Sequence, residues 1–133
     1  MDHVAELLVL TLAAGTPLVY AALGELVTEK AGVLNLGVEG MMLVGAVAAF
    51  IVTATTKNPW FGVGAGIAAG AALSIVFAVL TLTLMANQVA TGLALSLFGV
   101  GLSAFVGLDY VSVVIEGLQS TSLAALAATS AWS

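Results

Sequence analysis

The residues of this sequence that are best suited to chemistry lie in one short stretch, residues 31–42 (AGVLNLGVEGMM), which sets an asparagine and a glutamate among glycines. Asn35 carries a side chain that can cap a helix beginning one or two residues later. Glu39 would then lie in the first helical turn, where the helix dipole favours a negative charge. Gly37 and Gly40 permit backbone angles that are closed to other residues. Either these residues cap and orient an ordinary helix, or the stretch is a discontinuous helix whose free amides and glycines line a path through a membrane.

The remaining candidates for chemistry are weaker. Glu25 and Glu29 stand at helical spacing and resemble a carboxylate pair, but Lys30 follows directly, so we expect a surface turn there. His3, the one histidine, is at the N-terminus and is not expected to be a ligand. There is no cysteine, which excludes disulfides and thiolate metal sites. The sequence also has no nucleophile elbow, Walker A loop or metal-ligand cluster, so we expect neither an enzyme nor a metal or cofactor site in this chain.

The bulk composition places these residues in a membrane. Of the 133 residues, 62% are hydrophobic and 7% are charged, and the mean hydropathy is +1.23. A soluble domain carries about a quarter charged residues. The net charge of −5, with only two lysines or arginines, also argues against binding nucleic acid. We therefore expect membrane lipid to surround most of the chain.

The apolar residues form stretches about as long as a bilayer is thick. We predict an all-α, polytopic membrane protein with about four transmembrane helices and a discontinuous or re-entrant segment before the second. The second helix reaches across the membrane only if it begins near Val38. Orientation stays open, because only Lys30 and Lys57 count toward the positive-inside rule. The predicted spans cover residues 4–24, 38–56, 61–86 and 89–108.

Several residues predict where these helices bend or end. Pro17 releases one backbone hydrogen bond inside the first span, so we expect a kink there, satisfied by neighbouring helices or by the Thr16 hydroxyl. The first helix should end within residues 24–30 (GELVTEK), where charged residues gather, and Gly32 should break any short interfacial helix in that stretch. Residues 57–60 (KNPW) predict a loop in which proline stops the second helix.

Small residues recur at every fourth position of the third span and predict a face for close helix packing. They are Gly62, Gly66, Gly70 and Ser74. Weaker versions occur in the second and fourth spans, at Gly45, Ala49 and Thr53 and at Gly99, Ser103 and Gly107.

Asn87 and Gln88 interrupt a long uncharged stretch before the fourth span. Two adjacent amides in hydrocarbon need partners, so they lie either at a surface turn or on an interior face that a polar substrate reaches. Residues 1–116 form the predicted transmembrane region. Residues 117–133 form a tail rich in alanine, serine and threonine, onto which we place no structure.

Two segments carry a resemblance to a known family. Residues 16–46 (TPLVYAALGELVTEKAGVLNLGVEGMMLVGA) and residues 86–107 (ANQVATGLALSLFGVGLSAFVG) resemble the N-terminal half of permease subunits of bacterial ABC importers. The family includes branched-chain amino acid and ribose-type permeases, and the chain looks most similar to simple-sugar and nucleoside permeases.

The resemblance implies a multi-pass protein of a bacterial or archaeal cell membrane that carries no chemistry itself. It implies three partners: a second permease subunit, a cytoplasmic ABC ATPase and an extracytoplasmic substrate-binding lipoprotein. It makes Asn35, Gly37, Glu39 and Gly40, with Asn87 and Gln88, the candidates for shaping a path for a sugar or nucleoside. Members of this family are longer, and the tail does not resemble their continuation, so we expect a truncated or frame-shifted product. The alternative is a free-standing small helical membrane protein, a channel or assembly partner, that oligomerises through its glycine-rich faces.

Overall fold

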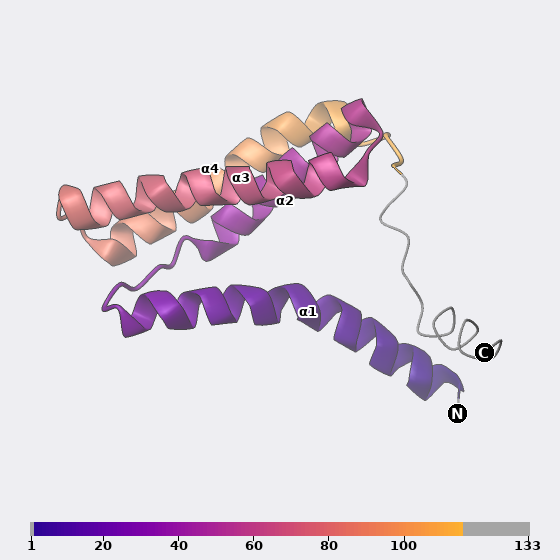
Figure 1. Cartoon of the computed structure of the whole chain (residues 1–133), viewed down its shortest axis with the longest axis horizontal. Coiled ribbons are helices and arrows are strands. Elements are labelled where there is room, and N and C mark those ends of the chain that lie inside the picture. The colour runs from indigo at the N-terminus through magenta and orange to yellow at the C-terminus, as the bar shows by residue number, and fades with distance from the viewer. Residues whose placement is uncertain (1, 116–133) are drawn as a thin grey trace, which may run out of the picture.

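The structure is a computed structural model that describes residues 2–115 of the chain, which form helices, turns and short irregular segments without a strand in that range (Figure 1). Four of its helical rods are long and apolar enough to cross a membrane, as predicted. In chain order the elements are α1 (Asp2–Lys30), α2 (Val38–Thr56), α3 (Pro59–Ala78), the π-helical turn η1 (Val79–Thr83), α4 (Gln88–Gly107) and the 3-10 turn η2 (Leu108–Tyr110).

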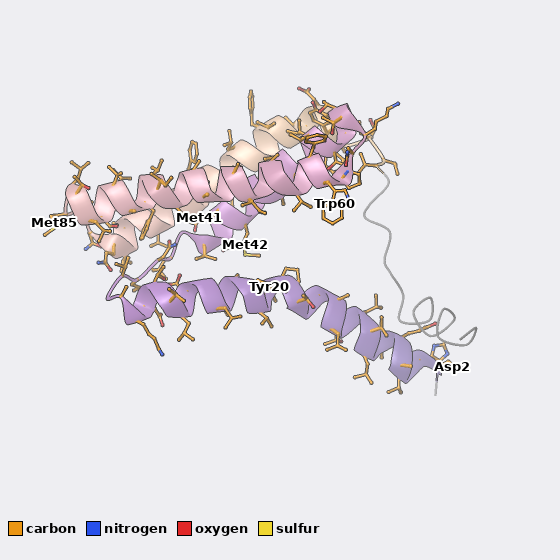
Figure 2. The ribbon with its side chains drawn as sticks, in the orientation of Figure 1. Asp2, Tyr20, Met41, Met42, Trp60 and Met85 are labelled. Atoms are coloured by element: carbon orange, nitrogen blue, oxygen red, sulfur yellow. The ribbon has the colours of Figure 1, made fainter. Side chains whose placement is uncertain are left out.

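Helix α2 is the centre of a three-helix bundle, since its main contacts are with both α3 and α4. Figure 1 shows α1 set apart from this bundle and joined to it at one end by the segment between α1 and α2. Trp60 and Met85 mark the two ends of the rod formed by α3 and η1 (Figure 2). Residues 31–37, the non-helical stretch between α1 and α2, form the linking segment.

Glycines bring α2 and α3 together almost backbone to backbone. A Cβ atom added at Gly66 would lie 3.0 Å from the carbonyl oxygen of Gly45 and 3.1 Å from the Cβ of Ala49. One added at Gly62 would lie 2.7 Å from the Ala49 carbonyl oxygen and would collide with the hydroxyl of Thr53. Small residues at such positions allow helices in a membrane to approach closely and gain van der Waals contact.

Helix α4 crosses α2 even more closely. A Cβ atom added at Gly99 would lie 2.5 Å from the Cα of Gly40. Around this crossing the buried apolar residues are few, namely Met41, Phe77 and Leu95, with Val33 and Leu73 packed against them. The outer faces of the helices are apolar and exposed, as suits a surface that lipid covers.

Helix α1 is one continuous rod with a bend in its middle part (Figure 1). It contains Pro17, and the Thr16 hydroxyl donates to the Leu12 carbonyl at 2.7 Å. The carbonyl that Pro17 leaves without its helical partner is that of Ala13, four residues earlier. The Thr16 hydroxyl therefore does not replace the lost hydrogen bond. The helix runs through residues 24–30 without a break, so the separate interfacial helix considered for that stretch does not form.

Gly32 ends α1. Its φ of +84° is the left-handed conformation that glycine adopts without strain. The Gly32 amide donates to the Glu29 carbonyl and the Val33 amide to the Thr28 carbonyl, both at 2.9 Å. This is a Schellman motif, which satisfies carbonyls at a helix end.

The turn between α2 and α3 is shorter than the predicted loop of residues 57–60. Lys57 closes α2 in the left-handed conformation, with a φ of 54°. Asn58 caps α3 by accepting the amide of Trp60 at 3.0 Å. Pro59 is the first residue of α3, where its missing N–H is not needed, so it begins α3 instead of stopping α2.

Helix α3 leads into η1, a turn of π-helix that the sequence pattern did not indicate. Thr81 is buried there, and its hydroxyl donates to the Phe77 carbonyl at 2.8 Å. The third rod therefore ends at Thr83 and not at residue 86, and Met85, with a φ of 53°, reverses the chain toward α4.

Candidate functional site: the linking segment and its cavity

Two backbone amides of the linking segment, which have no helical hydrogen bonds, donate to side chains of neighbouring helices. The Leu34 amide donates to Gln88 Oε1 at 2.8 Å, and the Asn35 amide donates to Glu25 Oε1 at 3.0 Å. Non-helical backbone is tolerated among membrane helices only where protein or water satisfies it. Glu25 lies on α1 and Gln88 on α4, so the segment is fastened to both helices.

The segment also lies directly on α4. The Ser96 hydroxyl donates to the Leu36 carbonyl at 2.8 Å. A Cβ atom added at Gly92 would lie 2.9 Å from the Leu36 amide nitrogen. The glycine in α4 is therefore what lets the linking segment pass so close to the helix axis.

Asn35 is buried, with 9% of its surface exposed, but it does not cap α2 as the sequence suggested. The N-cap residue is Gly37, and the Asn35 Oδ1 accepts the amide of Gly37 itself at 2.9 Å. Asparagine often forms such a turn with the amide two residues on. Asn35 thus fixes the last turn of the linking segment, one step before the helix begins. Its Nδ2 lies 3.7 Å from the sulfur of Met41.

The other predicted residues of this stretch have separate surroundings. A Cβ atom added at Gly40 would lie 2.5 Å from the Leu95 carbonyl oxygen, and one at Gly37 would lie 3.3 Å from the Gly92 carbonyl oxygen. Both glycines are therefore packed against α4. Glu39 is exposed in the first turn of α2, which begins at Val38 as predicted.

Asn87 and Gln88 lie in the turn that enters α4. Asn87 is exposed and caps α4, its Oδ1 accepting the Ala90 amide at 3.1 Å. Gln88 is half-buried and reaches back to Leu34. The turn interpretation fits Asn87, whereas Gln88 bonds to a segment 54 positions away in the chain.

A cavity of about 810 Å³ lies between α1, α2 and α3, with the linking segment at its edge. Figure 2 labels Tyr20 on α1 and Met42 on α2, which belong to opposite walls of this space. Its polar lining comes from α1, the linking segment and α3 and includes Tyr20, Glu25, Thr28, Asn35 and Ser74. Of the predicted packing strip, Gly62 faces α2 alone, whereas Gly66, Gly70 and Ser74 line the cavity.

Glu25 is the functional candidate that sequence reasoning missed. One carboxylate oxygen holds the Asn35 amide, and the other, Oε2, is buried without a hydrogen-bond partner among residues 2–115. The available signal was a carboxylate one turn before the end of a long apolar helix, but the neighbouring Glu29 and Lys30, both exposed here, suggested a surface turn. Within the described range, no group of three His, Asp or Glu side chains is placed to hold a metal ion.

The four apolar rods and the fastened linking segment define a multi-pass helical membrane protein with a cavity among its helices. The sequence model of the family described as branched-chain amino acid transport system / permease component matches residues 7–132. The chain belongs to this family, which confirms the resemblance seen in the sequence. The matched range includes residues 117–132 of the predicted tail, which lie outside the described residues.

Curated relatives are transport permeases. The chain is 54% identical over 117 residues to a putative glucose ABC transporter permease protein of Haloferax volcanii, covering 88% of this chain and 36% of the relative. It is 31% identical to a guanosine ABC transporter permease protein of Bacillus subtilis, over 72% of this chain and 32% of the relative. It is 32% identical to a nucleoside ABC transporter permease protein of Lactococcus lactis, over 68% and 30% respectively. The chain thus spans about a third of the length of these relatives. No solved structure matches it significantly.

Proposed function

We propose that this chain forms part of the membrane permease of an ABC-type importer and shapes the path of a simple sugar or nucleoside. The observation that carries the proposal is a non-helical segment that is fastened between α1 and α4 beside a cavity and has Asn35 and Gly37 buried. Non-helical backbone among membrane helices is tolerated where it is buried in protein or lines a cavity. Family membership and the glucose and nucleoside names of the relatives support the same conclusion.

Within this proposal the predicted residues have different tasks. Asn35 lines the cavity, Gly37 and Gly40 let the linking segment and α2 approach α4, and Asn87 starts α4. Gln88 holds the linking segment, and Glu39 lies exposed at the start of α2. ATP hydrolysis belongs to a separate cytoplasmic subunit. A second permease subunit and an extracytoplasmic binding protein complete the importer.

The alternative of a small protein that oligomerises through its glycine strip has less support. Gly62 and Gly66 are already in contact with α2 of the same chain. The part of that face around Gly62 and Gly66 is therefore not free to pack against another copy.

A chimaera tests the proposed function. The full chain replaces the matched third of the Haloferax volcanii relative, and the chimaera is produced in cells that lack that relative. Uptake of radiolabelled glucose and guanosine is then measured. We expect uptake of at least one solute well above that of cells without the chimaera.

The control is the same chimaera in cells that also lack the importer's ATPase, in which uptake should fall to background. Immunoblots of membrane fractions establish that equal amounts of chimaera are present. A chimaera that reaches the membrane in the normal amount and takes up neither solute would overturn the proposal.

A further inference from the structure

The cavity between α1, α2 and α3 has the size and lining of a small-molecule site. Its volume of about 810 Å³ falls within the range of roughly 300–1,000 Å³ that is common for ligand pockets. Most of its wall is apolar or glycine, with polar groups at a few points. Such sites use a few placed polar groups to orient a ligand on an apolar surface.

The polar groups of the wall retain hydrogen-bonding capacity. The Oδ1 of Asn35 accepts the Gly37 amide, whereas its Nδ2 has only the Met41 sulfur, a weak acceptor, at 3.7 Å. The Ser74 hydroxyl donates to the Gly70 carbonyl at 3.0 Å, which leaves its oxygen able to accept. The wall therefore offers both a donor and an acceptor from different elements.

Glu25 adds a hydrogen-bond acceptor that is not satisfied within the described part of the chain. Its Oε1 is committed to the Asn35 amide, and its Oε2 is buried without a partner among the described residues. A buried polar atom left unsatisfied costs free energy. A hydroxyl group brought to this wall supplies the missing donor, once the carboxylate turns toward the cavity.

The charge of the wall narrows the ligand class. Glu25 is the charged residue of the lining, and neither lysine of the chain, Lys30 or Lys57, contributes to the part of the wall that the structure describes. A phosphate or carboxylate group would meet a like charge here and no cation. Nucleotides, sugar phosphates and amino acids are thereby disfavoured.

The apolar part of the wall distinguishes between the uncharged candidates. Tyr20 on one wall and Met41, Met42 and Ile67 on the other give apolar surfaces between which a flat base can lie. A free hexose carries hydroxyls around its whole ring, and each one buried without a partner is costly. We infer that this cavity, walled by Glu25, Asn35, Met41 and Ser74, is a binding site for a nucleoside. The inference rests on the proposed function and narrows its solute class.

Equilibrium dialysis of the full purified chain in nanodiscs, with tritiated guanosine as the probe, tests this inference. Competition by unlabelled inosine, glucose, guanosine monophosphate and leucine defines the ligand class. We expect saturable guanosine binding that inosine displaces and the other three do not.

Two variants assign the binding to this cavity. Gly70→Leu places a large side chain on the cavity wall, where a Cβ atom would meet only the Met41 carbonyl oxygen at 3.9 Å. It should weaken guanosine binding about tenfold or more, the loss expected when a ligand is excluded from its pocket. Ser74→Ala should weaken binding by roughly threefold, the effect of one modest hydrogen bond.

The matched control is Gly64→Leu, the same substitution on the same helix. A Cβ atom at Gly64 has nothing within 4 Å, and the residue is exposed and not part of the wall. It should bind guanosine like the unaltered chain. Circular dichroism and size-exclusion elution confirm that all variants fold alike.

Three results would overturn the inference. They are equal guanosine binding by Gly70→Leu, Ser74→Ala and Gly64→Leu, competition by glucose or guanosine monophosphate as strong as that of inosine, and no binding by the unaltered chain at millimolar guanosine. The chimaera uptake assay is read separately. Uptake by the chimaera without nucleoside binding at this cavity defeats only the site, whereas loss of uptake defeats the proposed function.

Discussion

The most apolar 18-residue stretches of helices α1 and α2 have the same mean hydropathy of 1.8, yet α2 is packed inside the bundle and α1 is not. α2 buries Gly40, Met41 and Thr53 between α3 and α4. No residue of α1 is buried within the described part of the chain, and a Cβ atom at its Gly15 or Gly24 would meet nothing within 4 Å.

The difference shows that hydropathy and helix packing are separate properties in a membrane. Lipid tails are as apolar as leucine, so apolar side chains alone do not draw helices together. Helix α2 is held in place by glycines that let its backbone contact α3 and α4. The position of α1 depends instead on the linking segment and on the hydrogen bond that the Asn35 amide donates to Glu25. Substitutions at the two kinds of contact should therefore have different effects, global in one region and local in the other.

The largest effect should come from Gly99→Ala at the crossing of α2 and α4. The new Cβ would lie 2.5 Å from the Cα of Gly40, a backbone atom that cannot move aside alone. We expect a loss of roughly 3 kcal/mol in the free energy of unfolding, at the upper end of typical overpacking costs. Denaturant unfolding in detergent, followed by circular dichroism, measures it.

Gly101→Ala is the matched control, because a Cβ at Gly101 has nothing within 4 Å on the same helix. If both variants unfold at the same denaturant concentration, the close crossing does not hold the bundle.

Gly62→Ala should have the next largest effect, about 2 kcal/mol, by pushing α3 away from Ala49 and Thr53 of α2. Adding Thr53→Ala removes the side-chain part of the clash and should restore part of the stability, because the Ala49 carbonyl still lies 2.7 Å from the new Cβ. The same unfolding assay applies, with Gly64→Ala as the control. An unchanged midpoint for Gly62→Ala would contradict the packing of α3 on α2.

Glu25→Ala should act locally. The Asn35 amide loses its acceptor, which should favour local opening by roughly 1–3 kcal/mol. Hydrogen exchange followed by mass spectrometry should show faster exchange in peptides covering residues 31–37 and unchanged exchange within α4. Glu29→Ala, at an exposed position one turn on, should leave both unchanged. Faster exchange throughout the bundle would show that α1 and α2 are not held independently.

Asn87→Ala should cost about 1 kcal/mol in the free energy of unfolding, because α4 loses the cap on its Ala90 amide. Asn87→Asp keeps an acceptor oxygen and should restore most of the loss. A cost for the aspartate variant equal to that for alanine would assign the effect to something other than the cap.

The smallest effects should come from substitutions at the C-terminal ends of α1 and α2. α1 ends with Gly32 in the left-handed conformation, whereas α2 ends with Lys57 in it, at a cost that glycine avoids. Lys57→Gly should therefore raise the free energy of unfolding by up to about 1 kcal/mol. Gly32→Lys should lower it by a similar amount, and a stabilising Gly32→Lys would refute the assigned conformation.

Sequence patterns predicted the parts of this fold that depend on composition and local spacing. The four rods follow from hydropathy, and the start of α2 at Val38 follows from the length of its apolar stretch. The spacing of Gly62 and Gly66 predicted a packing face, because small residues at helical spacing are typical of one, and both glycines lie against α2.

Patterns did not predict contacts that depend on tertiary structure. Gln88 meets Leu34 only because α4 returns beside the linking segment, and nothing near either residue signals the other. Glu25 has an exposed glutamate and an exposed lysine as neighbours, which concealed that it faces inward. Asparagine is a common helix cap, but the Asn35 side chain accepts the nearer amide of Gly37 instead. Local backbone geometry decides between these two partners.

The π-helical turn at Val79–Thr83 changes the direction in which everything after it faces. One residue of an α-helix corresponds to about 100° of rotation, and a π-turn accommodates an additional residue without lengthening the rod by a full step. The fourfold spacing that runs from Gly62 to Ser74 therefore stops being a guide to facing beyond Ala78. Deleting one residue of this turn would therefore restore ordinary helix and leave the reversal at Met85 facing α4 much as it does now, whereas the same five residues wound as α-helix would turn that reversal by about 100° around the rod axis.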